Sequence, residues 1–236
     1  MNNYDRYLSS HLSTLTSLNT RTIKKQWISY NYTKFLPDDK NAAILEIGPG
    51  FGELLEFLVI DNNYSNVQAV DLSQEVVDYC NGIKNGLAIK VDNTINYLNN
   101  NRNKFNVIFL FQLLEHIPKK DVPDFLSALR DSLCENGRVI IEVPNIANPI
   151  VGAYSFFSDF THEVPYTEVS LRYVLNVARF SSIDIYEFKV PLISFKRAIQ
   201  GCLQSITNFL LLILMKIYLP SQKHYLSPTI FAVIKK

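Results

Sequence analysis

The stretch that decides the fold of this chain is Ala43-Ile44-Leu45-Glu46-Ile47-Gly48-Pro49-Gly50-Phe51-Gly52-Glu53. Its first part belongs to an apolar run, residues 42–47, that is broken only by Glu46 and is typical of a buried parallel strand. Glycines then alternate with other residues, and a helical pattern begins at Glu53. This order predicts a strand, a tight glycine turn and a helix N-terminus, which is where doubly wound sheets bind nucleotide-like ligands.

The spacing of the glycines narrows the class of ligand. A dinucleotide-binding turn follows the pattern G-x-G-x-x-G, and its third glycine would fall at position 53, which is a glutamate here. Two acids, Glu46 and Glu53, flank the turn and would repel a diphosphate. They suit instead a ligand that carries an ammonium group and a sulfonium group.

Strand-like and helix-like segments alternate along the rest of the chain. Apolar segments that predict strands cover residues 42–47, 67–70, 87–91, 105–111 and 138–143, and residues 183–190 and 229–234 predict a late antiparallel hairpin. Amphipathic segments such as residues 123–133 predict helices between them. The alternation indicates an α/β fold, a doubly wound and mostly parallel sheet with helices on both faces.

Two segments fall outside this alternation. Residues 1–40 are polar with weak helical periodicity, and they predict an N-terminal helical cap in front of a main domain formed by residues 41–236. Residues 146–166 lose all periodicity and are rich in aromatic residues. A connection of this length predicts a lid or a binding loop.

Length and composition exclude several classes of protein. A chain of 236 residues fits a single domain with a large core, and a formal charge of +1 gives no reason to expect nucleic acid as the partner. Cys80, Cys134 and Cys202 have the spacing of neither a zinc site nor a disulfide framework. The first residues lack the charged and apolar regions of a signal peptide, so we expect a cytoplasmic protein.

Two motifs resemble those of class I S-adenosylmethionine-dependent methyltransferases. The turn itself, E-x-G-x-G-x-G at residues 46–52, is similar to motif I of that family. Residues 105–117, which end in Leu114-Glu115-His116-Ile117, resemble its fourth strand and the turn that follows. The resemblance covers roughly residues 42–190. It implies a Rossmann-like, seven-stranded sheet whose last strand is antiparallel, with S-adenosyl-L-methionine as the cofactor.

The resemblance also implies which residues contact the cofactor. The glycine turn would lie at its methionine part, the acid that ends the second strand would accept hydrogen bonds from the ribose hydroxyls, and an acid after the third strand would meet the adenine. The end of the fourth strand would pass the sulfonium. The expected cofactor-binding residues are therefore Glu46, Gly48, Gly50, Gly52, Asp71, Leu72, Asp92, Asn93, Phe111 and Gln112. Simpler roles stay open for Asp71, as an acid at a helix N-terminus, and for Asp92, as a turn residue.

The candidate catalytic residues are two histidines and an acid at the expected mouth of the site. His162 is our candidate for the general base, with Asp159 or Glu163 orienting it or its substrate, and His116 is the second candidate. A neutral imidazole can take a proton near neutral pH. Simpler structural roles stay open for both histidines. Glu115, His116, Asp159 and His162 could also hold a divalent ion, but their spacing specifies no site, so we predict no metal.

The lid adds an expectation about the acceptor. The segment Asp159-Phe160-Thr161-His162, ahead of a helix that begins near Thr167, resembles a subgroup of bacterial methyltransferases of surface-polysaccharide or O-antigen (lipopolysaccharide) biosynthesis. This resemblance implies O-methylation of a sugar hydroxyl or of a phosphate-linked glycan group. Two alternatives remain: a small aromatic or quinone-like acceptor that stacks on the aromatic residues of the lid, and a non-catalytic cofactor-binding partner subunit.

An apolar run near the C-terminus completes the pattern. Residues 206–219 are almost wholly apolar and belong to a predicted helix at about 198–219. The run is shorter than the roughly 18 residues that span a bilayer. We favour a helix buried against the sheet or in a homodimer contact, and the alternative is a helix at a membrane surface, which would place the protein at the inner face of the membrane.

Overall fold

The computed structural model describes residues 18–191 and 195–236, and its centre is one seven-stranded sheet. The strand order is β3-β2-β1-β4-β5-β7-β6. The strands are β1 (Ile44–Ile47), β2 (Val67–Asp71), β3 (Ala88–Lys90), β4 (Phe105–Phe111), β5 (Leu133–Pro144), β6 (Ser182–Glu187) and β7 (Thr229–Lys235). Of the expected N-terminal cap, residues 1–17 lie outside the described residues.

The direction of the strands confirms the predicted fold class. Strands β1 to β5 pair parallel, whereas β7 pairs antiparallel with both β5 and β6. The last two strands therefore pair as predicted, but they form no simple hairpin because a long helix lies between them in the chain. The order reverses beside β1, so the glycine turn after β1 lies at the topological switch point where such sheets bind ligands.

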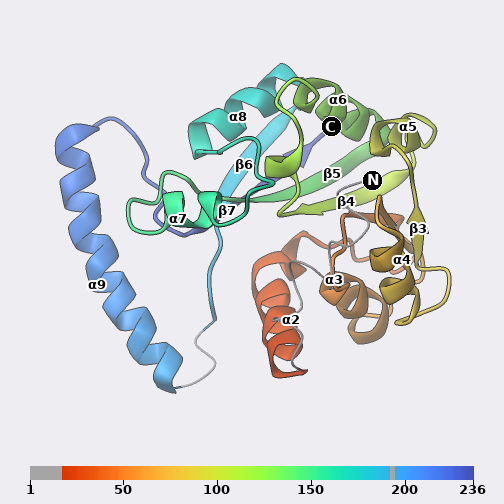
Figure 1. The fold of residues 1–236 in the computed structure, drawn as a ribbon, viewed down its shortest axis with the longest axis horizontal. Coiled ribbons are helices and arrows are strands. Elements are labelled where there is room, and N and C mark those ends of the chain that lie inside the picture. The colour runs from red at the N-terminus through yellow and green to blue at the C-terminus, as the bar shows by residue number, and fades with distance from the viewer. Residues whose placement is uncertain (1–17, 192–194) are drawn as a thin grey trace.

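Helices cover both faces of the sheet (Figure 1). One face carries α5 (Thr94–Asn99), α6 (Val122–Ser132) and α8 (Glu168–Val177). The other carries α2 (Leu18–Tyr32), with the 3₁₀ turn η1 (Thr33–Phe35), then α3 (Glu53–Glu56) and α4 (Gln74–Asn81). Helix α3 continues into a π-helical turn, η2 (Phe57–Asp61), and a second 3₁₀ turn, η3 (Leu114–His116), follows β4.

The core explains why the central strands read as continuous apolar runs. All four residues of β1 are buried, because both faces of this strand are covered. Leu45 and Ile47 pack on the α6 side with Ile108 and Leu110, whereas Ile44 packs on the α2 side. The layers hold the carboxyl ends of β1, β2 and β4 in fixed positions, where the expected site residues lie.

The lid is more regular than the sequence predicted. Residues 152–157 form a short helix, α7 (Gly152–Phe157), inside the segment expected to lack regular structure. Asn148 orders the turn that leads into it, because its Oδ1 accepts hydrogen bonds from the N–H groups of Ile150 and Val151 while its Nδ2 donates to the carbonyl of Leu226. Phe156 is then buried. The helix depends on a contact with a distant segment, which no local pattern reveals.

The C-terminal apolar helix departs most from expectation. Helix α9 (Phe195–Tyr218) begins earlier than predicted, and it stands apart from the body of the domain (Figure 1). By length and composition alone, the part of this helix at residues 197–218 could cross a membrane. Within it, no residue of the most apolar stretch of 18 residues is buried. The part of the favoured prediction that buries this helix against the sheet is therefore wrong, and the homodimer contact stays a prediction. The sequence suggested burial because apolar helices are usually core helices.

Candidate functional site

The glycine turn has the backbone that a close-fitting ligand loop requires. Gly48, Gly50 and Gly52 all have positive φ, at 71°, 53° and 67°, where other residues are strained. A Cβ added to Gly52 would lie 2.7 Å from the side chain of Ile83, so this glycine also permits close packing. A Cβ on Gly50 would meet no atom within 4 Å. The turn therefore leaves open space on the side where the cofactor is expected.

Glu46 is buried within β1, and one of its two carboxylate oxygens is unpaired among the described residues. It is 3% exposed, and its Oε2 has no hydrogen-bond partner among the described residues. Burial raises the pKa of Glu46 well above its usual value, and the nearby charges of Glu53 and Asp71 act in the same direction. A cation would relieve this cost, so the site fits a ligand that brings an ammonium group.

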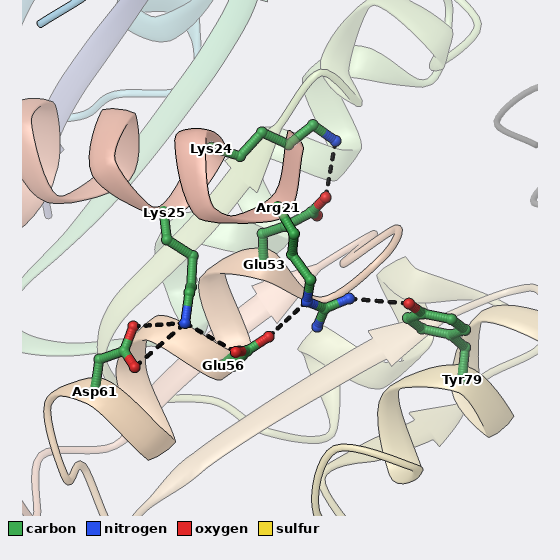
Figure 2. Close-up of polar contacts among 7 residues, drawn as sticks. All are labelled: Arg21, Lys24, Lys25, Glu53, Glu56, Asp61 and Tyr79. Atoms are coloured by element: carbon green, nitrogen blue, oxygen red, sulfur yellow. Dashed lines mark hydrogen bonds and ion pairs between the residues drawn. The ribbon is translucent and has the colours of Figure 1, made fainter. Parts of the chain in front are cut away.

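Glu53 has a different role from the one expected. Its Oε1 accepts a hydrogen bond from Lys24 Nζ at 2.8 Å, so its charge is balanced by helix α2 (Figure 2). One turn farther along α3, Glu56 forms ion pairs with two residues of α2, Arg21 at 2.6 Å and Lys25 at 2.8 Å. Of the two acids around the turn, Glu46 alone remains to meet a cationic ligand.

Asp71 lies at the end of β2, as predicted, with Leu72 half-buried beside it. Its Oδ1 accepts a hydrogen bond from the N–H of Ser73 at 2.7 Å. Burial raises the pKa of Asp71 to about 6, although the N–H groups of Ser73 and Leu72 lower it in part. The carboxylate is thus oriented by its own chain and is ionised at neutral pH.

Asp92 and Asn93 lie farther along the sheet edge and are both exposed. The side chain of Asn93 accepts a hydrogen bond from the N–H of Asn96 and caps helix α5. Helix capping therefore accounts for Asn93. The contact between Asp92 and adenine stays a prediction.

Phe111 and Gln112 end β4 in a strained turn. Gln112 has a φ of 48°, and its Nε2 donates to Glu142 Oε1 at 2.8 Å. Tyr32, from α2, donates a short hydrogen bond to the other oxygen of Glu142 and stacks on Phe111 with ring centroids 4.7 Å apart. Tyr32 and Glu142 support the predicted residues but were not predicted themselves. The available signal was Glu142 as the one acid inside the predicted strand 138–143.

The predicted catalytic residues come together beside this turn. The rings of His116 and His162 lie 4.6 Å apart between centroids, and His162 Nε2 lies 4.0 Å from Glu115 Oε1. The N–H groups of Glu163 and Val164 both donate to the carbonyl of Glu115, which fixes the lid on the turn after β4. Glu163 contributes its backbone there, whereas its carboxylate was the predicted part.

The same turn touches the glycine loop. A Cβ added to Gly48 would lie 3.2 Å from the side chain of Leu113, the residue before η3. The expected cofactor loop and the histidine cluster are therefore neighbours in space. The structure joins two groups of residues that the sequence could only place separately.

Hydrogen bonds fix the tautomers of both histidines. Thr161 donates its hydroxyl hydrogen to Asp159 Oδ1 at 2.7 Å and lies 2.9 Å from His116 Nδ1, so its oxygen accepts from Nδ1–H. His162 Nδ1 donates to the carbonyl of Phe156 at 2.7 Å. In each neutral imidazole the lone pair is then on Nε2. Asp159 orients His116 through Thr161, whereas the sequence predicted that it orients His162.

Charge in the cluster is unusual. Glu115 is fully buried and neither of its carboxylate oxygens has a hydrogen-bond partner among the described residues. Burial raises the pKa of Glu115 to about 8, helped by Glu142 and Asp159. Burial acts to raise the pKa of Asp159 as well, but the hydrogen bonds from Thr161 and the electrostatic attraction of His116 and His162 hold this pKa below its usual value. One potential ligand atom from each of Glu115, His116 and His162 lies within 4.8 Å of the other two.

Comparison with solved structures confirms the fold. A SAM-dependent methyltransferase from Archaeoglobus fulgidus superposes with a TM-score of 0.66 at 18% identity, over 92% of this chain and 94% of that one. A SAM-dependent methyltransferase from Thermotoga maritima gives 0.61 at 12% identity, over 92% and 90%. A phosphoethanolamine N-methyltransferase from Haemonchus contortus gives 0.61 at 14%, and this chain spans 61% of its length.

Sequence comparison supplies the family. No curated protein matches the chain. The family model described as a methyltransferase domain, however, matches residues 21–175, from the cap helix to helix α8. The matched segment includes the glycine turn, Asp71 and the histidine cluster. The chain therefore belongs to the methyltransferase domain family and is an S-adenosylmethionine-dependent methyltransferase.

Proposed function

We propose that this enzyme methylates a hydroxyl group, and that the hydroxyl belongs to a sugar or to a phosphate-linked glycan group in surface-polysaccharide biosynthesis. The observation that carries the proposal is the buried cluster of Glu115, His116 and His162 beside the glycine turn. S-adenosylmethionine, when bound, supplies an activated methyl carbon. The protein then has to align the acceptor and receive its proton.

The cluster suits a hydroxyl acceptor. An alcohol keeps its proton at neutral pH and needs a base as it reacts, whereas a neutral amine already offers a lone pair. Both imidazoles are held as Nδ1–H tautomers, so Nε2 of His162 or of His116 can take that proton. His162 is the leading candidate because its Nε2 lies toward the Glu115 carboxyl group.

The lid argues for a polar acceptor over a flat aromatic one. Of its large aromatic residues, Tyr154, Phe157 and Phe160 are mostly exposed. Phe156 and Tyr166 are buried, and the ring of Phe156 lies 5.2 Å from that of His162. The glycan assignment itself rests on the resemblance of the Asp159–His162 segment to polysaccharide-associated methyltransferases.

The test is an acceptor screen with mass-spectrometric detection of the methylated product. It offers sugar nucleotides, sugar phosphates and lipid-linked saccharides beside catechols and quinols. We expect methylation of a saccharide oxygen, and His162→Gln should lower kcat about 100-fold or more while leaving S-adenosylhomocysteine binding unchanged. His224→Gln, at a half-buried histidine outside the cluster, is the matched control. Transfer to nitrogen or to an aromatic hydroxyl would contradict the acceptor proposal, and full turnover by His162→Gln would contradict the base.

A further inference from the structure

We propose that Glu115, His116 and His162 form a binding site for one divalent transition-metal ion, of the zinc or manganese type. The residues come from two segments, the η3 turn and the lid, and their potential ligand atoms converge within 4.8 Å. The inference deepens the proposed function, because it assigns a ligand to the site where the acceptor is expected.

The strongest evidence is the unsatisfied carboxyl group of Glu115. Its side chain is 1% exposed, and both oxygens lack a hydrogen-bond partner among the described residues. A buried polar group without partners is costly, and natural structures rarely keep one without a use. One of its oxygens faces His162 Nε2. A cation between the two would satisfy both groups at once.

The histidines are supported as metal ligands usually are. A ligand imidazole commonly donates its second N–H to a carboxylate, directly or through another group, or to a backbone carbonyl. His116 does so through Thr161 and Asp159, and His162 does so to the carbonyl of Phe156. These contacts leave the lone pair of each ring on Nε2, the atom that would bind the ion.

Metal binding would draw the three ligand atoms together. Ligand atoms around a tetrahedral ion lie about 3.4 Å apart, given metal–ligand distances of about 2.1 Å. The 4.0 Å between His162 Nε2 and Glu115 Oε1 must therefore shorten by about 0.6 Å, and the other separations, which lie within 4.8 Å, by up to about 1.4 Å. No hydrogen bond to another described residue holds the Glu115 carboxyl group against this movement.

The ligand set selects the ion. Two imidazoles and one carboxylate suit zinc, manganese or ferrous iron better than magnesium or calcium, which prefer oxygen ligands alone. Three protein ligands leave a coordination position open for an acceptor oxygen. With the ion bound, Nε2 of both histidines is a ligand and takes no proton, so the ion replaces the histidine base of the proposed O-methylation. A metal-bound hydroxyl loses its proton more readily, and that proton would pass to solvent.

The test is titration of the full chain with Co²⁺ after removal of metals by a chelator, followed by visible absorption in the absence of cofactor and acceptor. We expect one Co²⁺ per chain with the absorption bands of a low-coordinate site. Glu115→Gln and His162→Gln should bind at least about 10-fold more weakly, and Thr161→Val should show a smaller loss. His224→Gln is the control and should match the wild type.

Two outcomes would overturn the metal site. One is absence of a Co²⁺ spectrum in the wild type at millimolar metal, and the other is equal binding by Glu115→Gln and the wild type. Circular dichroism checks that each variant folds, and Glu115→Gln changes little in shape. Because the readout needs no methyl transfer, a failed acceptor screen and a failed metal site are distinguishable.

A separate observation, the exposed helix α9, carries a second proposal. We propose that α9 lies flat on an anionic membrane surface. Large apolar side chains cover it along its whole length, and the ones exposed over at least half their surface are Phe195, Leu203, Ile206, Phe209, Leu210, Leu214, Ile217 and Tyr218. Such a continuous exposed apolar surface marks an interaction site.

Charge identifies the partner. From Phe188 to the C-terminus the sequence contains no Asp or Glu. The charged residues of this segment are all basic: Lys189, Lys196, Arg197, Lys216, Lys223, Lys235 and Lys236. Two copies of this segment would repel each other, whereas anionic lipid headgroups would attract it.

Topology excludes a helix that spans the bilayer. Lys189 is bound to Asn31 of α2, and Tyr225 is buried in the domain, so both ends of α9 return to the same body. A 24-residue helix is about 36 Å long, and the chain from Tyr218 to Tyr225 reaches at most roughly 25 Å. That segment would have to recross about 30 Å of hydrocarbon as irregular backbone, which lipid does not tolerate. A membrane-bound α9 would therefore lie along the surface.

Vesicle flotation tests this orientation. We expect the wild type to float with vesicles of phosphatidylcholine and phosphatidylglycerol, and less with phosphatidylcholine alone. The double variant Phe209→Glu/Ile213→Glu should stay in solution, and Val177→Glu, at an exposed position of α8, is the matched control. Absence of flotation by the wild type, or equal flotation by the double variant, would overturn the proposal. So would sedimentation equilibrium that shows an α9-dependent dimer without vesicle binding.

Discussion

Asp71 shows how a single carboxylate is prepared for a ligand. Its own chain orients it, through the N–H of Ser73, and burial brings its pKa to about 6. The residue type and the position at a strand end could be predicted because both follow from local sequence. The effect of burial could not, because it depends on how the surrounding layers pack.

The first prediction is the pH dependence of cofactor binding. Burial favours the neutral carboxyl form of Asp71, so the carboxylate that accepts the ribose hydroxyls is lost as the pH falls through about 6. Affinity for S-adenosylhomocysteine should be constant at pH 7 to 8 and weaken toward pH 5. Asp71→Asn should bind about 10- to 100-fold more weakly at pH 7.5 and lose this pH dependence. Calorimetry across the range checks it, and an unchanged profile in Asp71→Asn would count against the assignment.

The residues that support the predicted site residues could not themselves be predicted, and the reason is physical. Tyr32 and Glu142 are 110 positions apart in sequence and meet only in the folded chain. Glu53 looked like a ligand acid, but Lys24 from the same helix neutralises it. The sequence pattern predicts which side chains lie at the end of a strand. It does not predict which residues contact them, because those contacts arise from tertiary packing.

At the scale of elements, helix α2 is held by charge on one side and by aromatic packing on the other. Arg21, Lys24 and Lys25 bind the acids of α3 and η2, and Arg21 also donates to the hydroxyl of Tyr79 (Figure 2). Glu56 accepts from two of these cations. The helix thus braces the turn that begins at Gly48.

The second prediction concerns this brace. Glu56→Gln should lower the free energy of unfolding by about 1 kcal/mol, because two partly buried ion pairs are lost together. The difference in unfolding free energy between Glu56→Gln and the wild type should become smaller in 1 M salt, because the Debye length there is about 3 Å and the ion pairs are screened. Urea denaturation at both salt concentrations measures it. Glu135→Gln, at an exposed position, is the control, and an equal loss in both variants would show that the ion pairs contribute nothing.

The regular elements were predicted better than the irregular ones. Strands β1 to β4 appear within one or two residues of their predicted bounds because buried parallel strands are short apolar runs between turn residues. Helix α7 was missed because its start depends on the bond between Asn148 and Leu226. Residue patterns report local preference, and α7 exists through a non-local contact.

At the scale of the whole molecule, α9 is separate from the folding unit. The sheet closes through β6 and β7, which pair directly although α9 lies between them in the chain. Sequence alone could not separate an exposed apolar helix from a core helix, because both have the same composition. In the structure α9 is exposed, so it is not a core helix.

The third prediction follows from this separation. Replacement of Phe195–Tyr218 by a Gly/Ser linker of equal length should change the melting temperature by no more than about 2 °C, because the helix buries little and loop closure costs little. S-adenosylhomocysteine binding should stay the same. The same replacement of α8, whose Leu171 and Leu175 are fully buried, should unfold the domain. A large loss of stability on removing α9 would contradict an independent helix.

The central claim is that the glycine turn binds the methyl donor, and calorimetric titration with S-adenosylhomocysteine tests it most directly. Gly50 and Gly86 both have positive φ, and a Cβ at either would meet no protein atom within 4 Å. Alanine at the two positions should therefore cost similar backbone strain, about 1–2 kcal/mol. We predict that Gly86→Ala binds like the wild type and that Gly50→Ala loses at least about 10-fold in affinity, since its methyl group enters the ligand space. Absence of binding by the wild type at millimolar ligand, or equal binding by both variants, would contradict the claim.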